Sequence, residues 1–116
     1  MQLCEQCLLS LAKELRLEEQ AAIVYILASQ KEAAETKKEF SGITSESLKK
    51  ALRTTYSART VLDFLCRLGI IAKKKTDHTY KFRLSRSGQK LGTLILGDEQ
   101  TRAKVNAFFL IGKKGD

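Results

Sequence analysis

The chain has 116 residues, of which 43% are apolar, which is enough for one compact core and too short for two ordinary domains. We therefore expect a single domain over residues 1–116. Its net charge of +8 is concentrated centrally, because residues 49–90 hold twelve Lys or Arg against two Asp or Glu, whereas residues 1–48 hold five against eight. This segregation predicts one basic face for a polyanion, with nucleic acid ranked ahead of an anionic membrane.

The sequence offers no candidate membrane span. Its longest apolar run, residues 21–28, is far shorter than the roughly 20 residues that cross a bilayer. The N-terminus also lacks the basic start and small-residue cleavage site of a signal peptide. We therefore expect a cytoplasmic protein without a membrane partner. Its three cysteines are expected to be reduced, since disulfides are rare in the cytosol outside hyperthermophiles.

Residues 1–40 predict N-terminal helices that serve as core and dimer scaffold. A periodic apolar stripe predicts the first helix over residues 2–16. A second helix opens at Leu17, and residues 21–28 are apolar on every side. Either the first helix or a partner subunit is then expected to cover the side that the rest of the domain leaves open. Residues 30–39 are polar and predict either a solvated continuation of this helix or a mobile charged loop.

Residues 43–91 predict two short helices followed by a tight corner and a hairpin. Thr44 or Ser45 caps the first short helix, and Ser57 caps the second. Gly69 ends the second helix, because glycine adopts a left-handed conformation at the lowest cost. The positions expected to face inward are Leu48, Ala51, Leu52, Ala58, Val61, Leu62, Leu65 and Leu68.

Residues 70–84 predict a β-hairpin with its turn at residues 76–79. The return strand alternates Tyr80, Phe82 and Leu84 with Lys81 and Arg83, which is the period of a half-buried strand. We expect the hairpin to carry its charge on one face. The alternative interpretation is a solvated edge that its lysines protect from aggregation.

The C-terminal part predicts further helical structure. Ser85 caps one helix, and Asp98 caps a last segment over residues 98–112. Periodicity leaves residues 106–111 open between helix and strand, and the helix formers after Asp98 favour helix. The apolar residues of this segment, together with the first helix and residues 21–28, exceed what one small domain needs. Residues 98–112 are therefore expected to be a dimerisation segment, and the protein a homodimer.

Short motifs within the middle of the chain carry a family resemblance. The sequence SART at residues 57–60 starts the second short helix, LGII at residues 68–71 ends it, and LSRSGQKL at residues 84–91 leaves the hairpin. In this order and spacing they resemble the winged helix-turn-helix of small microbial transcription regulators of the MarR and ArsR type. The resemblance implies an α+β, mainly helical fold: a winged helix-turn-helix with a two-stranded wing and extra N- and C-terminal helices.

The resemblance implies binding to double-stranded DNA, with the helix capped by Ser57 in the major groove and the hairpin on the adjacent minor groove. Arg59 is the best candidate for a guanine contact, because its planar guanidinium donates two hydrogen bonds at once. Alternatively, Arg59 only pairs with Asp63 one turn further on. The candidate DNA-binding residues are Lys49, Lys50, Arg53, Thr55, Tyr56, Ser57, Arg59, Thr60, Lys73, Lys74, Lys75, His78, Lys81 and Arg83.

Several of these candidates have a simpler interpretation. The hydroxyls of Thr54, Thr55 and Ser57 suit phosphate contacts. The alternative interpretation is that these residues only cap the helix. His78 stands alone at a predicted turn, where an exposed and idle side chain is the alternative to a DNA contact.

Cys4 and Cys7 form a Cys-x-x-Cys pair, but structural zinc needs four ligands, and Cys66 and His78 do not complete a set. We expect no metal site. Both thiols lie on the apolar stripe and are expected to pack as small hydrophobes or to form a disulfide across a dimer interface. Cys66 is expected to be structural.

Catalysis has no support in the sequence. It contains no paired-carboxylate, nucleophile–base or phosphate-loop pattern, so we expect neither an enzyme nor a cofactor. The expected function is sequence-specific DNA binding as a dimeric transcription regulator. Two alternatives stay open: a winged-helix protein–protein interaction module, and a non-specific nucleic-acid-binding accessory of chromatin or replication. The sequence identifies no small-molecule effector.

Overall fold

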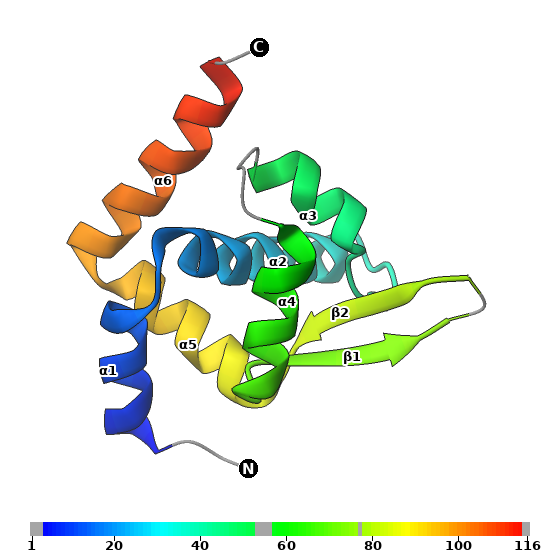
Figure 1. The fold of residues 1–116 in the computed structure, drawn as a ribbon, viewed down its shortest axis with the longest axis horizontal. Helices are drawn as coiled ribbons and strands as arrows, with labels where there is room; N and C mark the ends of the chain where they lie inside the picture. Colours follow the sequence, from blue (N-terminus) through cyan, green and yellow to red (C-terminus); the bar gives the residue numbers. More distant parts are fainter. Residues whose placement is uncertain (1–3, 53–56, 77, 115–116) are drawn as a thin grey trace.

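The structure is a computed structural model that describes residues 4–52, 57–76 and 78–114, with side chains as far as Phe109. Within these ranges it is mainly helical with one two-stranded antiparallel sheet, so the predicted α+β class is confirmed (Figure 1). No helix in the same ranges is long and apolar enough to cross a membrane. The elements are α1 (Glu5–Glu14), α2 (Leu17–Glu35), α3 (Ser45–Leu52), α4 (Ala58–Arg67), β1 (Ile71–Lys75), β2 (Tyr80–Leu84), α5 (Arg86–Gly97) and α6 (Glu99–Lys114).

The predicted helix starts after residue 40 are confirmed. At each, a side-chain oxygen accepts a hydrogen bond from the backbone amide three residues further on, with donor–acceptor distances of 3.0 to 3.4 Å. This satisfies one of the amides that the first turn of a helix leaves unpaired. The four capping residues are Thr44, Ser57, Ser85 and Asp98.

Helix α2 lies at the centre of the molecule and is covered by its own chain (Figure 1). Ala21, Ala22, Ile23 and Ile26 have no exposed surface. Helices α3, α4, α5 and α6 and strand β2 all pack against α2, with α5 and α6 making the most extensive contacts. The apolar segment of α2 is therefore covered within one chain and needs no partner subunit. The first helix contributes little of this cover; it meets the start of α2, where the side-chain amide of Gln20 donates to the carbonyl of Ala12 at 2.7 Å. Periodicity showed that every side must be covered, but it carried no information about which elements return to α2.

Helix α2 continues past Gln30 as a solvated helix but ends at Glu35, so the alternative of a mobile loop is excluded and the predicted extension to residue 39 is wrong. Lys37 adopts a left-handed conformation, with φ of 57°. The amide of Lys38 donates to the carbonyl of Ala33 at 2.8 Å, and the amide of Lys37 donates to that of Ala34 at 3.2 Å. These two bonds form a Schellman motif, which closes the helix without the usual glycine.

The C-terminal segment is helical, as favoured by the sequence. Val105 is fully buried, Thr101 is 8% exposed, and Phe108 and Phe109 pack partly buried against the core. Helix α6 packs against α2, α3 and α5 of the same chain. Much of the apolar surface that suggested a dimer is therefore used inside one chain.

The hairpin is tied to the helical body through strand β2. Ile43 and Phe82 exchange both backbone hydrogen bonds, at 2.7 and 2.8 Å, and form an antiparallel bridge. The side-chain oxygen of Gln30 accepts a hydrogen bond from the amide of Leu84 at 3.1 Å. Both contacts occupy the edge of β2 that β1 leaves open, which fixes the base of the hairpin against α2.

Residues 84–91, which follow the hairpin, bring the start of α5 into contact with the corner after α4. The Ser85 hydroxyl donates to the carbonyl of Gly69 at 2.6 Å, and the Ser85 amide donates to the carbonyl of Ile70 at 2.9 Å. Gly69 has a φ of 78°, which confirms the predicted left-handed corner. A Cβ added to Gly88 would lie 2.1 Å from the Ile70 oxygen. The motif thus encodes a close backbone contact.

Candidate nucleic-acid interface

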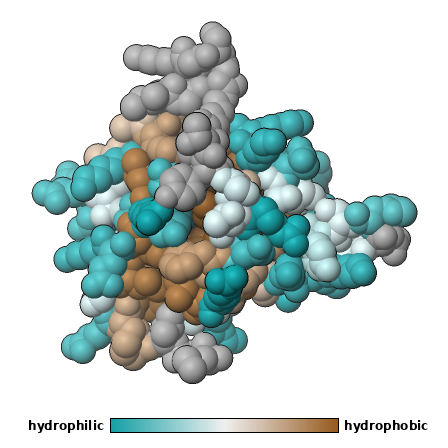
Figure 2. All heavy atoms as spheres, viewed as in Figure 1, coloured by the Kyte–Doolittle hydropathy of each residue, from teal (hydrophilic) through white to brown (hydrophobic). Residues whose placement is uncertain are grey.

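Helices α3 and α4 and the hairpin lie next to one another on one side of the molecule, and the hairpin projects from the body (Figure 1). Figure 2 shows hydrophilic residues over the projecting hairpin, whereas hydrophobic residues gather near the centre of the same view. These three elements hold all the predicted DNA-binding residues that the structure describes. Arg53, Thr55 and Tyr56, together with Thr54, lie outside the described residues.

The outward positions of α3 and α4 are as predicted. Lys49 and Lys50 are exposed in the last turn of α3, because Leu48 and Leu52 turn the apolar side of this helix into the core. Arg59 and Thr60 are exposed in the first turn of α4, where Ala58, Val61, Leu62 and Leu65 form the buried side. Ser57 is exposed and caps the helix, so its capping role is confirmed.

Arg59 makes the ion pair that was the alternative to a base contact. Its Nε lies 3.4 Å from Oδ1 of Asp63, and the two side chains are 49% and 42% exposed. A solvent-exposed pair at this helical spacing contributes only about 0.3–0.5 kcal/mol. Such a weak pair leaves the guanidinium available to a polyanion, so the two roles do not exclude each other.

Tyr80 was not among the predicted site residues. Two cations lie over its ring, with Cζ of Arg59 5.3 Å and Nζ of Lys73 4.8 Å from the ring centroid. Both distances fall in the range of cation–π contacts. These contacts link the first turn of α4 to the hairpin. The strand register was the available signal, because it pairs Lys75 with Tyr80 and so places Lys73 on the same face as Tyr80.

The hairpin carries charge on both faces, and the prediction of a single charged face is wrong. Directly paired residues share a face, so Lys73 and Lys75 lie on the face of Phe82 and Tyr80. Lys74 pairs with Lys81, and both lie on the opposite face with Arg83. Three consecutive lysines cannot share one face of a strand, because side chains alternate. His78 is exposed in the turn.

The second face of the hairpin borders a basic groove of about 470 Å³ between the end of α2 and the start of α5. Lys38, Arg83 and Arg86 line it, and no acidic residue does. Phe40 contributes an aromatic side chain, and the other lining residues are Gln30, Ala34, Ala72, Leu84, Ser85 and Gln89. Lys38 was missed because it lies far from Arg83 in the sequence, and its proximity to Arg83 depends on how β2 docks on α2. Arg86 lies only three residues after Arg83, but its place in the same groove became apparent only with the packing of α5 and α2.

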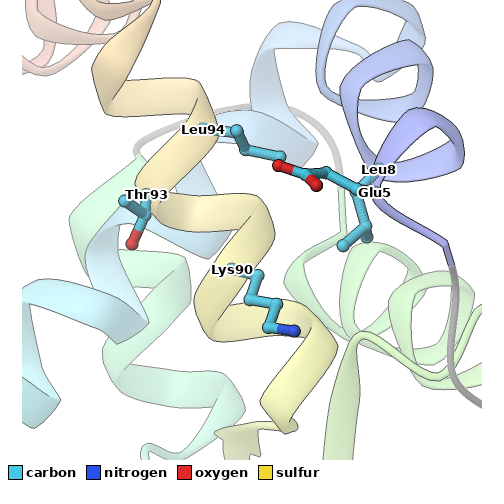
Figure 3. A pocket seen from close by; sticks show the side chains of 5 residues that line it. All are labelled: Glu5, Leu8, Lys90, Thr93 and Leu94. Carbon is cyan, nitrogen blue, oxygen red and sulfur yellow. The ribbon is translucent and has the colours of Figure 1, made fainter.

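A second hollow, of about 330 Å³, lies between α1 and α5 (Figure 3). Glu5, Leu8, Lys90, Thr93 and Leu94 line it, so it has one acidic and one basic group. Its lining therefore carries no excess positive charge for an anion. Of these two hollows, only the groove beside the hairpin is lined by several basic residues and no acidic one.

Cys4 and Cys7 are exposed, and the prediction that they pack as small hydrophobes is wrong. The apolar stripe of α1 is covered only from Leu8 onward, where Leu8, Ala12 and Leu15 are buried. Cys66 is partly buried against the core, as expected of a structural thiol. Across the part of the chain that the structure describes, no group of three or more His, Cys, Asp or Glu side chains is placed to hold a metal ion.

Comparison with protein-family models, with curated proteins and with solved structures found no match for this chain.

Proposed function

We propose that the chain is a winged helix-turn-helix protein that binds double-stranded DNA as a homodimer and regulates transcription. One observation carries the proposal: the exposed first turn of α4, with Arg59 and Thr60, is joined through Tyr80 to a hairpin rich in lysine. A helix that enters the major groove needs such exposed polar residues near its N-terminus. A basic hairpin beside it supplies phosphate contacts.

The order of the elements supports the fold part of the proposal. After helix α2, Ile43 forms a one-residue β-bridge with strand β2. Helices α3 and α4 and the hairpin then follow in the chain. This arrangement suits a helix-turn-helix with a wing. Helices α1, α5 and α6 are then the additions that complete the core around α2.

The proposed contacts divide into two kinds. Arg59 and Thr60 read bases, because they are exposed on the helix that the groove would admit. Lys49 and Lys50 on α3, and Lys73, Lys74, Lys75, Lys81 and Arg83 on the hairpin, neutralise phosphates. Since Lys74, Lys81 and Arg83 lie on the second face of the hairpin, we propose that this face follows the DNA backbone beside the groove.

A salt-dependent binding experiment tests this division. A duplex selected from a random pool and its scrambled version are titrated with the protein at several salt concentrations. Arg59→Ala is expected to weaken binding to the selected duplex by about 1–3 kcal/mol more than binding to the scrambled one. Equal weakening of both would show that Arg59 does not read bases.

Lys74→Ala is the complementary variant. It is expected to weaken binding to both duplexes equally and to lower the salt slope by about one counterion. Lys13→Ala is the matched control, because Lys13 is an exposed lysine on α1, away from the hairpin, and it should change neither affinity nor slope. If the wild type selects no duplex but binds all of them, the non-specific accessory is favoured.

The homodimer rests on apolar surface that one chain leaves exposed. Leu9 is 44% exposed and Phe64 is 38% exposed, and they lie on α1 and α4. Phe64 also lines a groove between these helices together with Leu11 and Val61. Sedimentation at micromolar concentration is expected to show a dimer that Phe64→Lys converts to a monomer. A monomeric wild type would exclude the dimer.

The DNA titration tests the remaining alternative. Absence of DNA binding in low salt would favour a protein-interaction module.

A further inference from the structure

The two thiols at the start of α1 are in direct contact. The Sγ atoms of Cys4 and Cys7 lie 2.7 Å apart and share a hydrogen bond. Cys4 is the N-cap of α1, and the Cys7 amide donates to Cys4 Sγ at 3.2 Å. The start of the helix therefore holds the two side chains next to each other, with Cys4 at the N-cap and Cys7 three residues later in the first turn.

This geometry favours a thiolate on Cys4. A helix N-terminus stabilises negative charge through its unpaired amides and its dipole. The pKa of the Cys4 thiol is lowered because Cys7 donates a side-chain hydrogen bond to its thiolate and also donates its backbone amide. The pKa of the Cys7 thiol is raised because its proton is retained in the bond to Cys4. Cys4 is thus the nucleophile of the pair, and Cys7 keeps its proton.

Both sulfur atoms are also accessible, since Cys4 and Cys7 are exposed. An exposed, hydrogen-bonded dithiol is the arrangement in which a mixed disulfide on one sulfur can be attacked by the other. We propose that Cys4 and Cys7 are a redox-active dithiol that closes to an intramolecular disulfide by exchange with a low-molecular-weight disulfide such as oxidised glutathione.

The exchange proceeds in two steps. The Cys4 thiolate attacks one sulfur of the glutathione disulfide, the S–S bond breaks, and one glutathione thiolate leaves. Cys7 then loses its proton to the departing thiolate or to water and attacks Cys4 Sγ, which expels the second glutathione. Two protein thiols are oxidised and one glutathione disulfide is reduced to two glutathione molecules. The reverse reaction restores the dithiol.

Cys66 provides an internal comparison. It is partly buried beside the core, and burial raises the pKa of its thiol. A buried thiol with little thiolate reacts slowly in exchange. Cys66 should therefore keep its thiol under conditions that oxidise the pair on α1.

The proposal is tested on the reduced full-length chain without DNA, so its outcome is independent of the proposed function. The protein is equilibrated with mixtures of reduced and oxidised glutathione, quenched in acid, alkylated and weighed as an intact chain. The expected product is a monomer that has lost two hydrogen atoms and carries one alkylated thiol. Three alkylated thiols in oxidised glutathione alone, or disulfide-linked dimers, would overturn the proposal.

Single-cysteine changes assign the roles. Cys66→Ala should still close the disulfide, and its product should contain no alkylated thiol. Cys7→Ser should trap glutathione on Cys4, because the resolving thiol is missing. Cys4→Ser should acquire glutathione on Cys7 more slowly, because the N-cap position, which accepts the Cys7 amide and would stabilise a thiolate, then holds no sulfur. Faster reaction of Cys4→Ser than of Cys7→Ser would show that Cys4 is not the attacking thiol.

Discussion

Gly88 occupies a position where a single methyl group does not fit. The Cβ of an alanine there would overlap the carbonyl oxygen of Ile70, which belongs to the backbone and cannot move aside as a flexible side chain can. The same carbonyl accepts the amide hydrogen bond of Ser85. The corner after α4 and the start of α5 are therefore held together by close backbone contact as well as by the hydroxyl of Ser85.

Gly88→Ala is expected to lower the free energy of unfolding by about 1–3 kcal/mol, because the start of α5 must shift away from Ile70. Urea denaturation measures this loss. Gly97→Ala is the matched control on the same helix, since a Cβ at Gly97 has open space around it. The control should be neutral or slightly stabilising, because alanine favours helix over glycine. Equal stability of the two variants would contradict the close approach.

Asp98 makes the stability of the protein depend on pH. The pKa of its carboxyl is lowered because the hydroxyl and then the amide of Thr101 donate hydrogen bonds to the carboxylate. A group whose folded pKa is depressed stabilises the fold above its unfolded pKa of about 3.9, and that contribution is lost as the pH falls through the folded value.

Asp98→Asn keeps a capping oxygen but has no proton to gain, so its stability should fall less steeply than that of the wild type below about pH 4. Thermal unfolding from pH 6 to pH 2.5 measures the two curves. They should converge at low pH, where Asp98 is protonated in both the folded and the unfolded wild type. Parallel curves over the whole range would exclude the role assigned to Asp98.

At the scale of elements, the sequence predicted what local chemistry determines. The caps Thr44, Ser57, Ser85 and Asp98 start their helices because a short oxygen-bearing side chain satisfies a free amide wherever the helix later packs. The return strand β2 followed from the alternation of Tyr80, Phe82 and Leu84 with Lys81 and Arg83 in the same way. These signals lie within a few residues of the feature that they predict.

The errors concern features that depend on distant parts of the chain. Periodicity placed Cys4 and Cys7 on the apolar side of α1, but whether this side is covered depends on where the packing of its neighbours ends. The contact of Arg59 with the Tyr80 ring likewise requires α4 to dock beside the hairpin. A single sequence contains no direct signal for either arrangement, so the exposed dithiol and the link through Tyr80 appeared only in the structure.

The contact between Lys73 and Tyr80 inside the hairpin can be measured as a coupling energy. A double-mutant cycle of Lys73→Ala with Tyr80→Leu is expected to give a coupling of about 0.5–1 kcal/mol, because Lys73 lies over the ring. The same cycle with Lys74→Ala should give no coupling, since Lys74 is the next residue but lies on the opposite face. Equal couplings for the two lysines would contradict the observed register.

At the scale of the whole molecule, charge and core are arranged around α2. The apolar middle of α2 is enclosed by α3, α4, α5, α6 and β2, and α1 packs on α5, so the first and last helices belong to the same core as α3, α4 and the hairpin. The exposed lysines of α3 and of the hairpin lie on the outside of that core. Support and candidate interface are thus parts of one cooperative unit.

The hydrogen bond between Gln30 and Leu84 spans 54 residues, and α3, α4 and most of the hairpin lie in the loop that it closes. Closing so long an interval costs chain entropy before the bond contributes any stability. Gln30→Ala is expected to lower the free energy of unfolding by about 1 kcal/mol. Most of this loss should appear as faster unfolding and little as slower folding, measured by stopped-flow mixing with urea. The hairpin would then be the last element to join the folded chain, and it would dock after the rate-limiting step of folding.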